Sequence, residues 1–184
     1  MKPVLIFLAD GFEEIEAVTV IDVLRRADIN VHTIAVSERL MVEGAHGLKI
    51  KTDATIKDIV MDEYPMIVLP GGTTGVENMR SNDDLVDFLI NSKERPIAAI
   101  CAAPTLLCDL KILRDCKATC YPSLANVLYN SNINVETTSV VKDKNFITSR
   151  GPATAMEFAL AIVEELKGSE RKVAEAEKML VNVA

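Results

Sequence analysis

The centre of the chain carries the decapeptide Pro96-Ile97-Ala98-Ala99-Ile100-Cys101-Ala102-Ala103-Pro104-Thr105. Its apolar run, residues 97–100, is too short for a helix and predicts a buried strand, whereas Pro104 suits a first helical turn, where its missing N–H group needs no partner. Cys101 is therefore expected at a strand-to-helix turn, with its sulfur facing free N–H groups that favour a thiolate. The alternative is a buried core cysteine, which is common for this residue type.

Short apolar runs alternate with amphipathic segments on both sides of this stretch. Strands are predicted at residues 4–9, 31–36, 66–69, 97–100 and 118–121, with an edge strand or hairpin arm at 48–52 and a hairpin formed by 135–141 and 145–148. Helices are predicted at residues 13–27, 55–60, 82–91, 123–129, 153–166 and 169–181, and after Pro104. This order predicts an α/β fold with a mostly parallel, doubly wound sheet and helices on both faces. We expect one domain over residues 1–184, because no linker or repeat divides them.

The amino-acid composition and charge argue against several classes of function. The chain has 184 residues, 49% of them hydrophobic, and a formal net charge of −7. This acidity and the lack of a basic patch argue against a nucleic-acid partner. No apolar run reaches membrane-spanning length and no signal peptide follows Met1, so we expect a cytoplasmic protein without a membrane partner whose four cysteines are reduced thiols.

Glu16 is the unusual residue of the first predicted helix. At about 100° per residue it shares an arc with apolar side chains such as Val20, Val23 and Leu24. A carboxyl group among apolar side chains tends to hold its proton, because desolvation penalises the charged form, and it can then donate a hydrogen bond. Glu16 is thus a candidate acid; the alternative is a carboxylate that reaches solvent at the edge of the arc or pairs with an arginine.

Three features follow predicted strand ends: the turn before Glu16, the pair Gly71-Gly72, and Cys101. Ligands of parallel sheets bind beyond the carboxyl ends of the strands, so the three could share one pocket. The glycines match neither the GxGxxG nor the GxxxxGK[ST] pattern, and on their own they predict a structural turn. The cysteine and histidine spacings do not form a zinc motif. We therefore expect no cofactor and no metal.

A Cys-His pair has little support. His32 and His46 both precede Cys101 far along the chain, and neither follows a predicted strand end near the proposed pocket. If the thiolate forms, Glu16 and the helix N-terminus must sustain it.

The chain resembles the DJ-1/ThiJ/PfpI superfamily, and within it the DJ-1 branch. The resemblance lies in Asp10-Gly11-Phe12-Glu13-Glu14-Ile15-Glu16, Val68-Leu69-Pro70-Gly71-Gly72, Ala98-Ala99-Ile100-Cys101-Ala102-Ala103-Pro104 and Thr148-Ser149-Arg150-Gly151-Pro152, in the family's order over nearly the whole length. It implies a flavodoxin-like fold, with Cys101 as an oxidation-prone nucleophile on a strained turn and Glu16 as a protonated glutamate bonded to its sulfur. Gly72 and Ala102 would supply the N–H groups of an oxyanion site.

The resemblance also implies supporting positions for Gly71, Tyr121 and Arg150, and a homodimer with the first helix, including Arg26, near the interface. Activities of the family are cofactor-free conversion of methylglyoxal or glyoxal to hydroxy acids, deglycation of amines and thiols, peroxide sensing by cysteine oxidation, and chaperone behaviour. The family also carries a ThiJ label linked to thiazole monophosphate metabolism. The expected partners are therefore a small aldehyde or glycated substrate and a second copy of the chain.

Three positions depart from the family pattern. Tyr121 precedes Pro122 where the branch commonly has a histidine, and a phenol is a poor proton acceptor near neutral pH. Ala102 follows the cysteine where the family's peptidases have histidine, so we expect no peptidase activity. His46 stands where the branch often has an arginine at the dimer contact.

Two hypotheses follow from the sequence. In the first, the Cys101 thiolate attacks an aldehyde, the amides of Gly72 and Ala102 hold the oxyanion, and Glu16 moves the protons. In the second, the protein is a non-catalytic redox sensor or oxidative-stress chaperone in which Cys101 is oxidised to a sulfinate stabilised by protonated Glu16.

Overall fold

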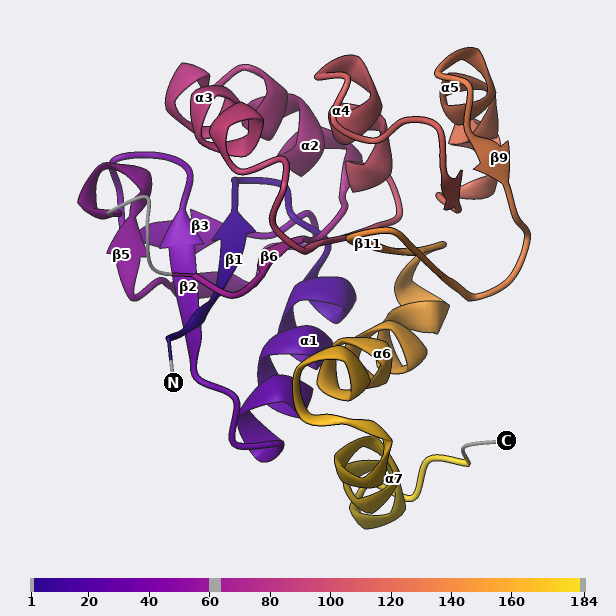
Figure 1. The fold of residues 1–184 in the computed structure, drawn as a ribbon. Helices are drawn as coiled ribbons and strands as arrows, with labels where there is room; N and C mark the ends of the chain where they lie inside the picture. Colours follow the sequence, from indigo (N-terminus) through magenta and orange to yellow (C-terminus); the bar gives the residue numbers. More distant parts are fainter. Residues whose placement is uncertain (1, 60–63, 183–184) are drawn as a thin grey trace.

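A seven-stranded sheet forms the centre of the computed structural model, which describes residues 2–59 and 64–182 (Figure 1). Its strand order is β10-β11-β7-β6-β1-β2-β5. The strands are β1 (Val4–Leu8), β2 (Val31–Ala35), β5 (Ala54–Thr55), β6 (Ile67–Leu69), β7 (Ile97–Ile100), β10 (Val140–Asp143) and β11 (Phe146–Ser149). Every neighbouring pair is parallel except β10 and β11. The predicted mostly parallel sheet and the hairpin near its end are thus confirmed.

Helices cover both faces of the sheet. One face carries α1 (Glu14–Arg26) and α6 (Ala155–Lys167), with α7 (Ser169–Lys178) packed outside α6, and the other carries α2 (Thr73–Arg80), α3 (Asp83–Asn91), α4 (Ala103–Asp109) and α5 (Ala125–Asn130) (Figure 1). Three 3₁₀ turns are η1 (Ile56–Asp58), η2 (Pro122–Leu124) and η3 (Pro152–Thr154). Two small sheets lie outside the main one: the antiparallel hairpin of β3 (Met41–Glu43) and β4 (Lys49–Lys51), and the parallel pair of β8 (Lys117–Ala118) and β9 (Asn134–Val135).

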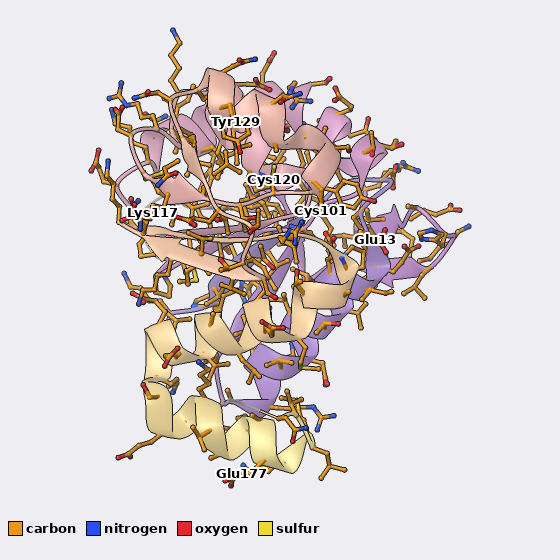
Figure 2. All side chains as sticks on the ribbon, turned by 90° about the vertical axis from the view of Figure 1, so that its right-hand side faces the viewer. Glu13, Cys101, Lys117, Cys120, Tyr129 and Glu177 are labelled. Carbon is orange, nitrogen blue, oxygen red and sulfur yellow. The ribbon has the colours of Figure 1, made fainter. Side chains whose placement is uncertain are left out.

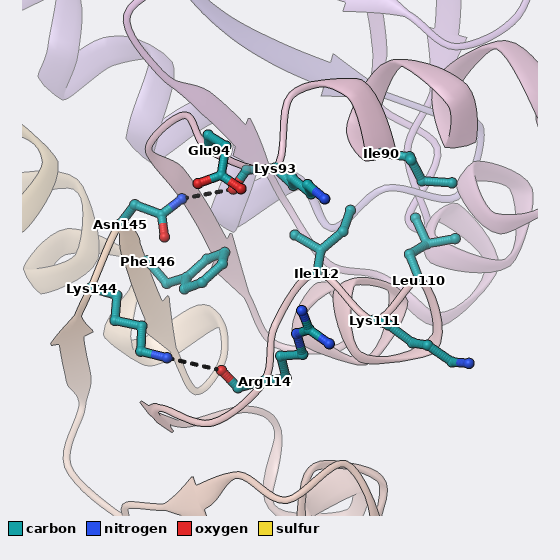
Figure 3. A pocket seen from close by; sticks show the side chains of 10 residues that line it. All are labelled: Ile90, Lys93, Glu94, Leu110, Lys111, Ile112, Arg114, Lys144, Asn145 and Phe146. Atoms are coloured by element: carbon teal, nitrogen blue, oxygen red, sulfur yellow. Dashed lines mark hydrogen bonds between the residues drawn. The ribbon is translucent and has the colours of Figure 1, made fainter.

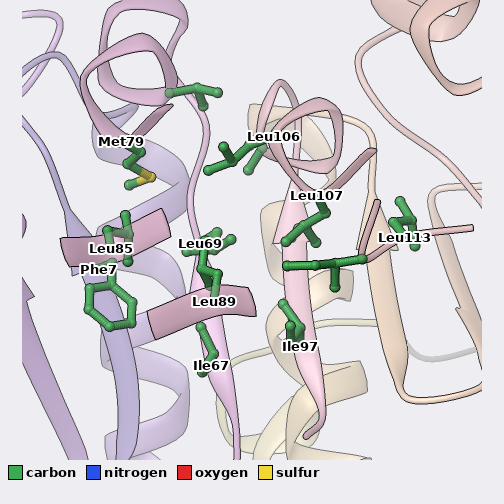
Figure 4. Packing of buried hydrophobic residues seen from close by; sticks show 14 of the residues in the cluster. Phe7, Ile67, Leu69, Met79, Leu85, Leu89, Ile97, Leu106, Leu107 and Leu113 are labelled. Atoms are coloured by element: carbon green, nitrogen blue, oxygen red, sulfur yellow. The ribbon is translucent and has the colours of Figure 1, made fainter. Parts of the chain in front are cut away.

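The sheet separates two apolar layers. Leu5 and Phe7 of β1 face the layer formed with α2, α3 and α4, part of which Figure 4 shows, whereas Ile6 and Leu8 face the layer formed with α1 and α6. All five residues of β1 are buried, as expected for a parallel strand covered on both sides.

The chain order makes the space between β1 and β6 a switch point. After β1 the chain continues to β2 on one side, and after the hairpin it returns to β6 on the other. Loops that leave neighbouring strands in opposite directions open a crevice at the carboxyl edge of the sheet. The segment before Glu16 and the pair Gly71-Gly72 leave this switch point, and Cys101 follows the next strand, β7.

Several predicted elements differ in the structure. Residues 71–75, expected to form a turn, lead into the unpredicted helix α2; its Thr73, Thr74 and Gly75 have low helix propensity, but buried Val76 and Met79 anchor the helix. The helix predicted at residues 55–60 is the end of β5 followed by η1, and residue 60 lies outside the described residues. The strand expected at 118–121 is limited to β8, and the segment 135–141 divides into β9 and β10.

No helix in the described ranges is long and apolar enough to cross a membrane. The four cysteines are all free thiols, as predicted.

Candidate active site

Cys101 occupies a strained turn at the carboxyl end of β7. Its φ is +64°, a left-handed value that costs a non-glycine residue about 1–3 kcal/mol. Two main-chain hydrogen bonds hold the turn: Cys101 N donates to the Ser149 oxygen at 3.0 Å, and Tyr121 N donates to the Cys101 oxygen at 2.9 Å. Figure 2 shows Cys101 at the level of the sheet, between the helices of its two faces. Cys101 is half-buried, whereas the other three cysteines are buried.

Glu16 lies in the first turn of α1 with no exposed surface. Its Oε2 accepts a hydrogen bond from Gly71 N at 2.7 Å, and its carboxyl group is hydrogen-bonded to Cys101. Among the described residues, Oε1 has no partner and no arginine pairs with the carboxyl group. This excludes the solvent-reaching and arginine-paired alternatives. Burial raises the pKa of Glu16 to about 7, against the lowering effects of the Gly71 and Cys101 hydrogen bonds.

The thiol of Cys101 is a weaker acid than the sequence predicts. Burial is the main cause that raises its pKa to about 12, and the charge of ionised Glu16 and the hydrogen bond to it act in the same direction. The backbone N–H groups of Gly72 and Ala102 do bind the sulfur and lower the pKa, as expected for amides at helix starts. Burial outweighs the effect of these amides, so the pKa of Cys101 is raised, against the expectation that the helix N-terminus favours a thiolate. Because Glu16 loses its proton at lower pH than Cys101, a neutral-pH attack by Cys101 needs a base beside the sulfur, and Glu16 is in that position.

Two glycines let the loops after β1, β6 and β7 meet. A β-carbon on Gly71 would lie 2.6 Å from Cys101 Cβ and 2.7 Å from Glu16 Oε2, so a side chain there would occupy the site itself. Gly72 has a φ of +93°, and a β-carbon on it would meet the Gly11 carbonyl oxygen. Only glycine allows this backbone conformation and approach at low cost. The structure therefore brings Cys101, Glu16, Gly71, Gly72 and Ala102 together.

Tyr121 and Arg150, the other two expected residues, lie next to this group and make different contacts. Tyr121 is tied to Cys101 through its main chain, and its half-exposed ring packs near Gly151. The Arg150 guanidinium donates to the Thr137 oxygen at 3.1 Å. It also lies near Cys120, where burial raises the thiol pKa to about 11 and the Arg150 charge opposes that rise. Arg150 therefore supports the neighbouring loop rather than Cys101.

A charged cluster near Glu16 was not predicted from the sequence. The Glu14 carboxylate pairs with His46 Nδ1 at 2.8 Å and accepts a hydrogen bond from His46 N at 2.6 Å, which raises the pKa of His46. Glu13 completes a set of three potential ligand atoms that lie within 4.8 Å of one another. His46 comes from the β3–β4 connection, so no spacing motif marks the cluster. The charge of Glu13 contributes to the raised pKa of Glu16.

We expect the Gly71→Ala variant to damage the site specifically. The added methyl group would press on Cys101 and Glu16, and overpacking of this kind costs about 1–3 kcal/mol of unfolding free energy. Chemical denaturation and the rate of Cys101 alkylation by iodoacetamide would measure both effects. Gly151→Ala is the matched control, because the nearest atom to its β-carbon is 3.4 Å away, and it should change stability by less than about 0.5 kcal/mol. Equal effects in the two variants would contradict the packing described here.

Comparisons with known proteins agree with this architecture. Residues 2–165 match the model of the DJ-1/PfpI family. The chain is 41% identical to protein dj-1beta of Drosophila melanogaster over 98% of this chain and 97% of that protein. The crystal structure of Drosophila DJ-1beta superposes with a TM-score of 0.94, at 39% identity and 99% coverage of both chains. The oxidized DJ-1 of Toxoplasma gondii superposes with a TM-score of 0.93, at 33% identity and full coverage of both chains.

A more distant relative is a deglycase from Pyrococcus horikoshii, 32% identical over 89% of this chain and 99% of that protein. Together with the sheet order and the turn at Cys101, these similarities show that the chain belongs to the DJ-1/PfpI family, in its DJ-1-like branch.

Proposed function

We propose that the protein is a cysteine-dependent, cofactor-free enzyme that acts on small reactive aldehydes, as a glyoxalase or deglycase does. One observation carries the proposal. The fully buried carboxyl group of Glu16 is hydrogen-bonded to the Cys101 side chain, and its Oε1 has no hydrogen-bond partner among the described residues. A buried, unsatisfied oxygen costs free energy, and sites that tolerate this cost are often functional. A pKa of about 7 also suits a group that must both take and give a proton near neutral pH.

The first step forms a hemithioacetal. The Cys101 sulfur attacks the aldehyde carbon of methylglyoxal while Glu16 takes the thiol proton, and the π electrons of the carbonyl move to its oxygen. The N–H groups of Gly72 and Ala102, which already bind the sulfur, are close enough to stabilise the developing oxyanion. Protonated Glu16 then gives its proton to that oxygen, which completes the hemithioacetal and restores the carboxylate.

The second step rearranges this adduct. Glu16 removes the proton from the carbon that carries the sulfur, which gives an enediolate. The hydroxyl proton of the adduct moves to the oxygen of the former ketone, and Glu16 returns its proton to the carbon of that ketone. The product is a lactoyl thioester on Cys101, which water hydrolyses to lactate and the free thiol. Overall, methylglyoxal and one water give lactic acid, without an external oxidant or reductant.

The similarity to a protein named a deglycase supports this proposal. The direct test is the conversion of methylglyoxal to lactate by the purified protein, with product identification and without glutathione or any other cofactor. We expect lactate in stoichiometric yield. No turnover above the uncatalysed rate would contradict the enzymatic proposal.

A second candidate function is peroxide sensing, favoured by the exposure of the cysteines. Cys101 is half-buried and hydrogen-bonded to Glu16, whereas the other cysteines are at most 7% exposed. Oxidation of the thiol by two equivalents of peroxide gives a sulfinate and two waters, and protonated Glu16 could donate a hydrogen bond to the new oxygens. Peptide mass mapping after mild peroxide should find two added oxygens on Cys101 alone; oxidation spread over Cys108, Cys116 and Cys120 would speak against sensing.

We also propose a homodimer formed through α1 and the β3–β4 hairpin. Ile15 and Val18 of α1 are 55% and 41% exposed, and Leu48 and Met41 of the hairpin are each 48% exposed. Val18 and Ile50 of β4 line one hollow, together with charged side chains such as Arg25 and Asp53, so the exposed apolar residues of α1 and of the hairpin lie close together. Sedimentation equilibrium should give about twice the chain mass for the wild type and for Tyr129→Asp, and a monomer for Val18→Asp. A monomeric wild type would contradict the proposal.

A further inference from the structure

A pocket lies at the end of β7 and β11 that is opposite the candidate active site. Its volume is about 370 Å³, within the range of small-molecule sites. Phe146, the first residue of β11, lines it and pairs in register with Ile97, the first residue of β7. Cys101 follows the last residue of β7, so the length of one strand, roughly 13 Å at ~3.3 Å per residue, separates the two sites.

The pocket is strongly cationic in an acidic protein. Four of its lining side chains are Lys93, Lys111, Arg114 and Lys144, against the single carboxylate of Glu94. They come from three separate segments: the loop after α3, the loop after α4 and the β10–β11 turn (Figure 3). The whole chain, by contrast, has a net charge of −7. A local positive field of this kind attracts anions and raises their local concentration.

These four cations are also unpaired. Within residues 2–59 and 64–182 none of them forms an ion pair, whereas most other described lysines and arginines do. Lys144 Nζ donates to the Arg114 carbonyl oxygen, at 3.4 Å. Figure 3 shows the Lys93 ammonium and the Arg114 guanidinium on either side of Ile112. Their donors remain available to a ligand.

The backbone places two of these cations at turns. Lys111 and Lys144 have φ values of +57° and +52°, in the left-handed region that favours glycine and asparagine. Lys111 follows the C-terminus of α4 and Lys144 lies in the β10–β11 turn, two positions where left-handed backbone is common. Both side chains are exposed, so the two turns present their ammonium groups to the pocket.

We propose that this pocket binds a small organic anion that carries two phosphate groups, the chemistry shared by nucleoside diphosphates and sugar bisphosphates. The Arg114 guanidinium can bind one phosphate through two parallel hydrogen bonds. The ammonium groups of Lys93, Lys111 and Lys144 supply positive charge for the second phosphate. Ile112 and Phe146 offer an apolar floor to the carbon skeleton. An extended nucleic acid fits less well, because the cations are confined to one small hollow.

Isothermal titration calorimetry with ADP, fructose 1,6-bisphosphate and inorganic pyrophosphate tests the proposal. We expect one organic diphosphate to bind with an affinity that falls as salt rises. The relative affinities of ADP and fructose 1,6-bisphosphate identify the source of the diphosphate. The Lys93→Ala/Arg114→Ala double variant should weaken binding at least about tenfold, since each charged hydrogen bond contributes roughly 1.5–3 kcal/mol. Cys101→Ser should bind normally, so this test is independent of the proposed enzymatic function.

The double variant Lys111→Gly/Lys144→Gly separates binding from stability. Glycine accepts the left-handed backbone, so the melting temperature should rise or stay unchanged, while diphosphate affinity should fall at least about tenfold. Leu180→Gly, also at a left-handed position, controls for the backbone, and Lys167→Ala controls for loss of one charge elsewhere. The proposal is overturned if neither organic diphosphate binds, if pyrophosphate binds as tightly as both, or if affinity is unchanged in both double variants.

Discussion

Replacing Cys101 by serine is expected to reduce methylglyoxal turnover by at least about 10³-fold, the scale on which enzymes lose activity when a nucleophile is removed. A serine hydroxyl is a much weaker acid than a thiol, and Glu16, with a pKa of about 7, is too weak a base to activate it. The steady-state rate of lactate formation would measure the effect. The fold should be unaffected, because the two side chains have nearly the same shape.

Matched controls are available in the same chain. Cys108→Ser and Cys120→Ser change thiols that are buried outside the site, and both should keep most of the activity once corrected for stability. If Cys101→Ser retained turnover while one of these controls lost it, the nucleophile would have to be assigned elsewhere.

Replacing Glu16 by glutamine is expected to stabilise the protein by about 3 kcal/mol near pH 8. The folded pKa of Glu16 is about 7, above its ordinary value of 4.5. Between these pH values the folded state holds a proton that the unfolded state has released, so wild-type stability falls as pH rises through this window. Each pKa unit corresponds to about 1.4 kcal/mol. Glutamine has no charge to bury, so the variant lacks this loss.

Denaturant unfolding at about pH 4.5 and about pH 8 measures this difference. The increase in unfolding free energy caused by Glu16→Gln should be small at pH 4.5 and should reach its full value at pH 8. Glu14→Gln is the control on the same helical turn: burial raises the pKa of Glu14, but the hydrogen bonds from His46 outweigh this and lower it. That variant should therefore gain no stability at pH 8. A Glu16→Gln variant that is less stable than the wild type at pH 8 would mean that Glu16 is buried as a favourable ion.

The sequence predicted the parallel sheet because its apolar runs are short, β-branched and separated by helical patterns. It also predicted the turn at Cys101, from a strand that ends four residues before a proline, and the burial of Glu16, from helical periodicity. It did not predict α2, because Thr73, Thr74 and Gly75 are poor helix formers. That helix depends on contacts such as the Gly75 N–H bond to the Gly11 oxygen, which no local pattern reveals.

The acid–base properties of the site were the part that could not be read from local sequence. Helix position alone predicted an acidic thiol, yet the pKa depends on desolvation and on the contact between residues 16 and 101, which only the fold creates. The same holds for the Glu14–His46 pair and for the cationic pocket, whose residues come from distant segments. Long-range proximity, rather than local propensity, determines all three.

We propose that Cys101 and Glu16 act as one proton-sharing unit, and the pH dependence of kcat/KM for methylglyoxal tests this role. Between about pH 5 and pH 9, kcat/KM of the wild type should rise in one step near pH 7, as Glu16 loses its proton and becomes a base, and then level off. The Glu16→Gln variant should have a low kcat/KM that shows no step near pH 7. A step near pH 7 that persists in Glu16→Gln would show that another group titrates, and would contradict the role assigned to Glu16.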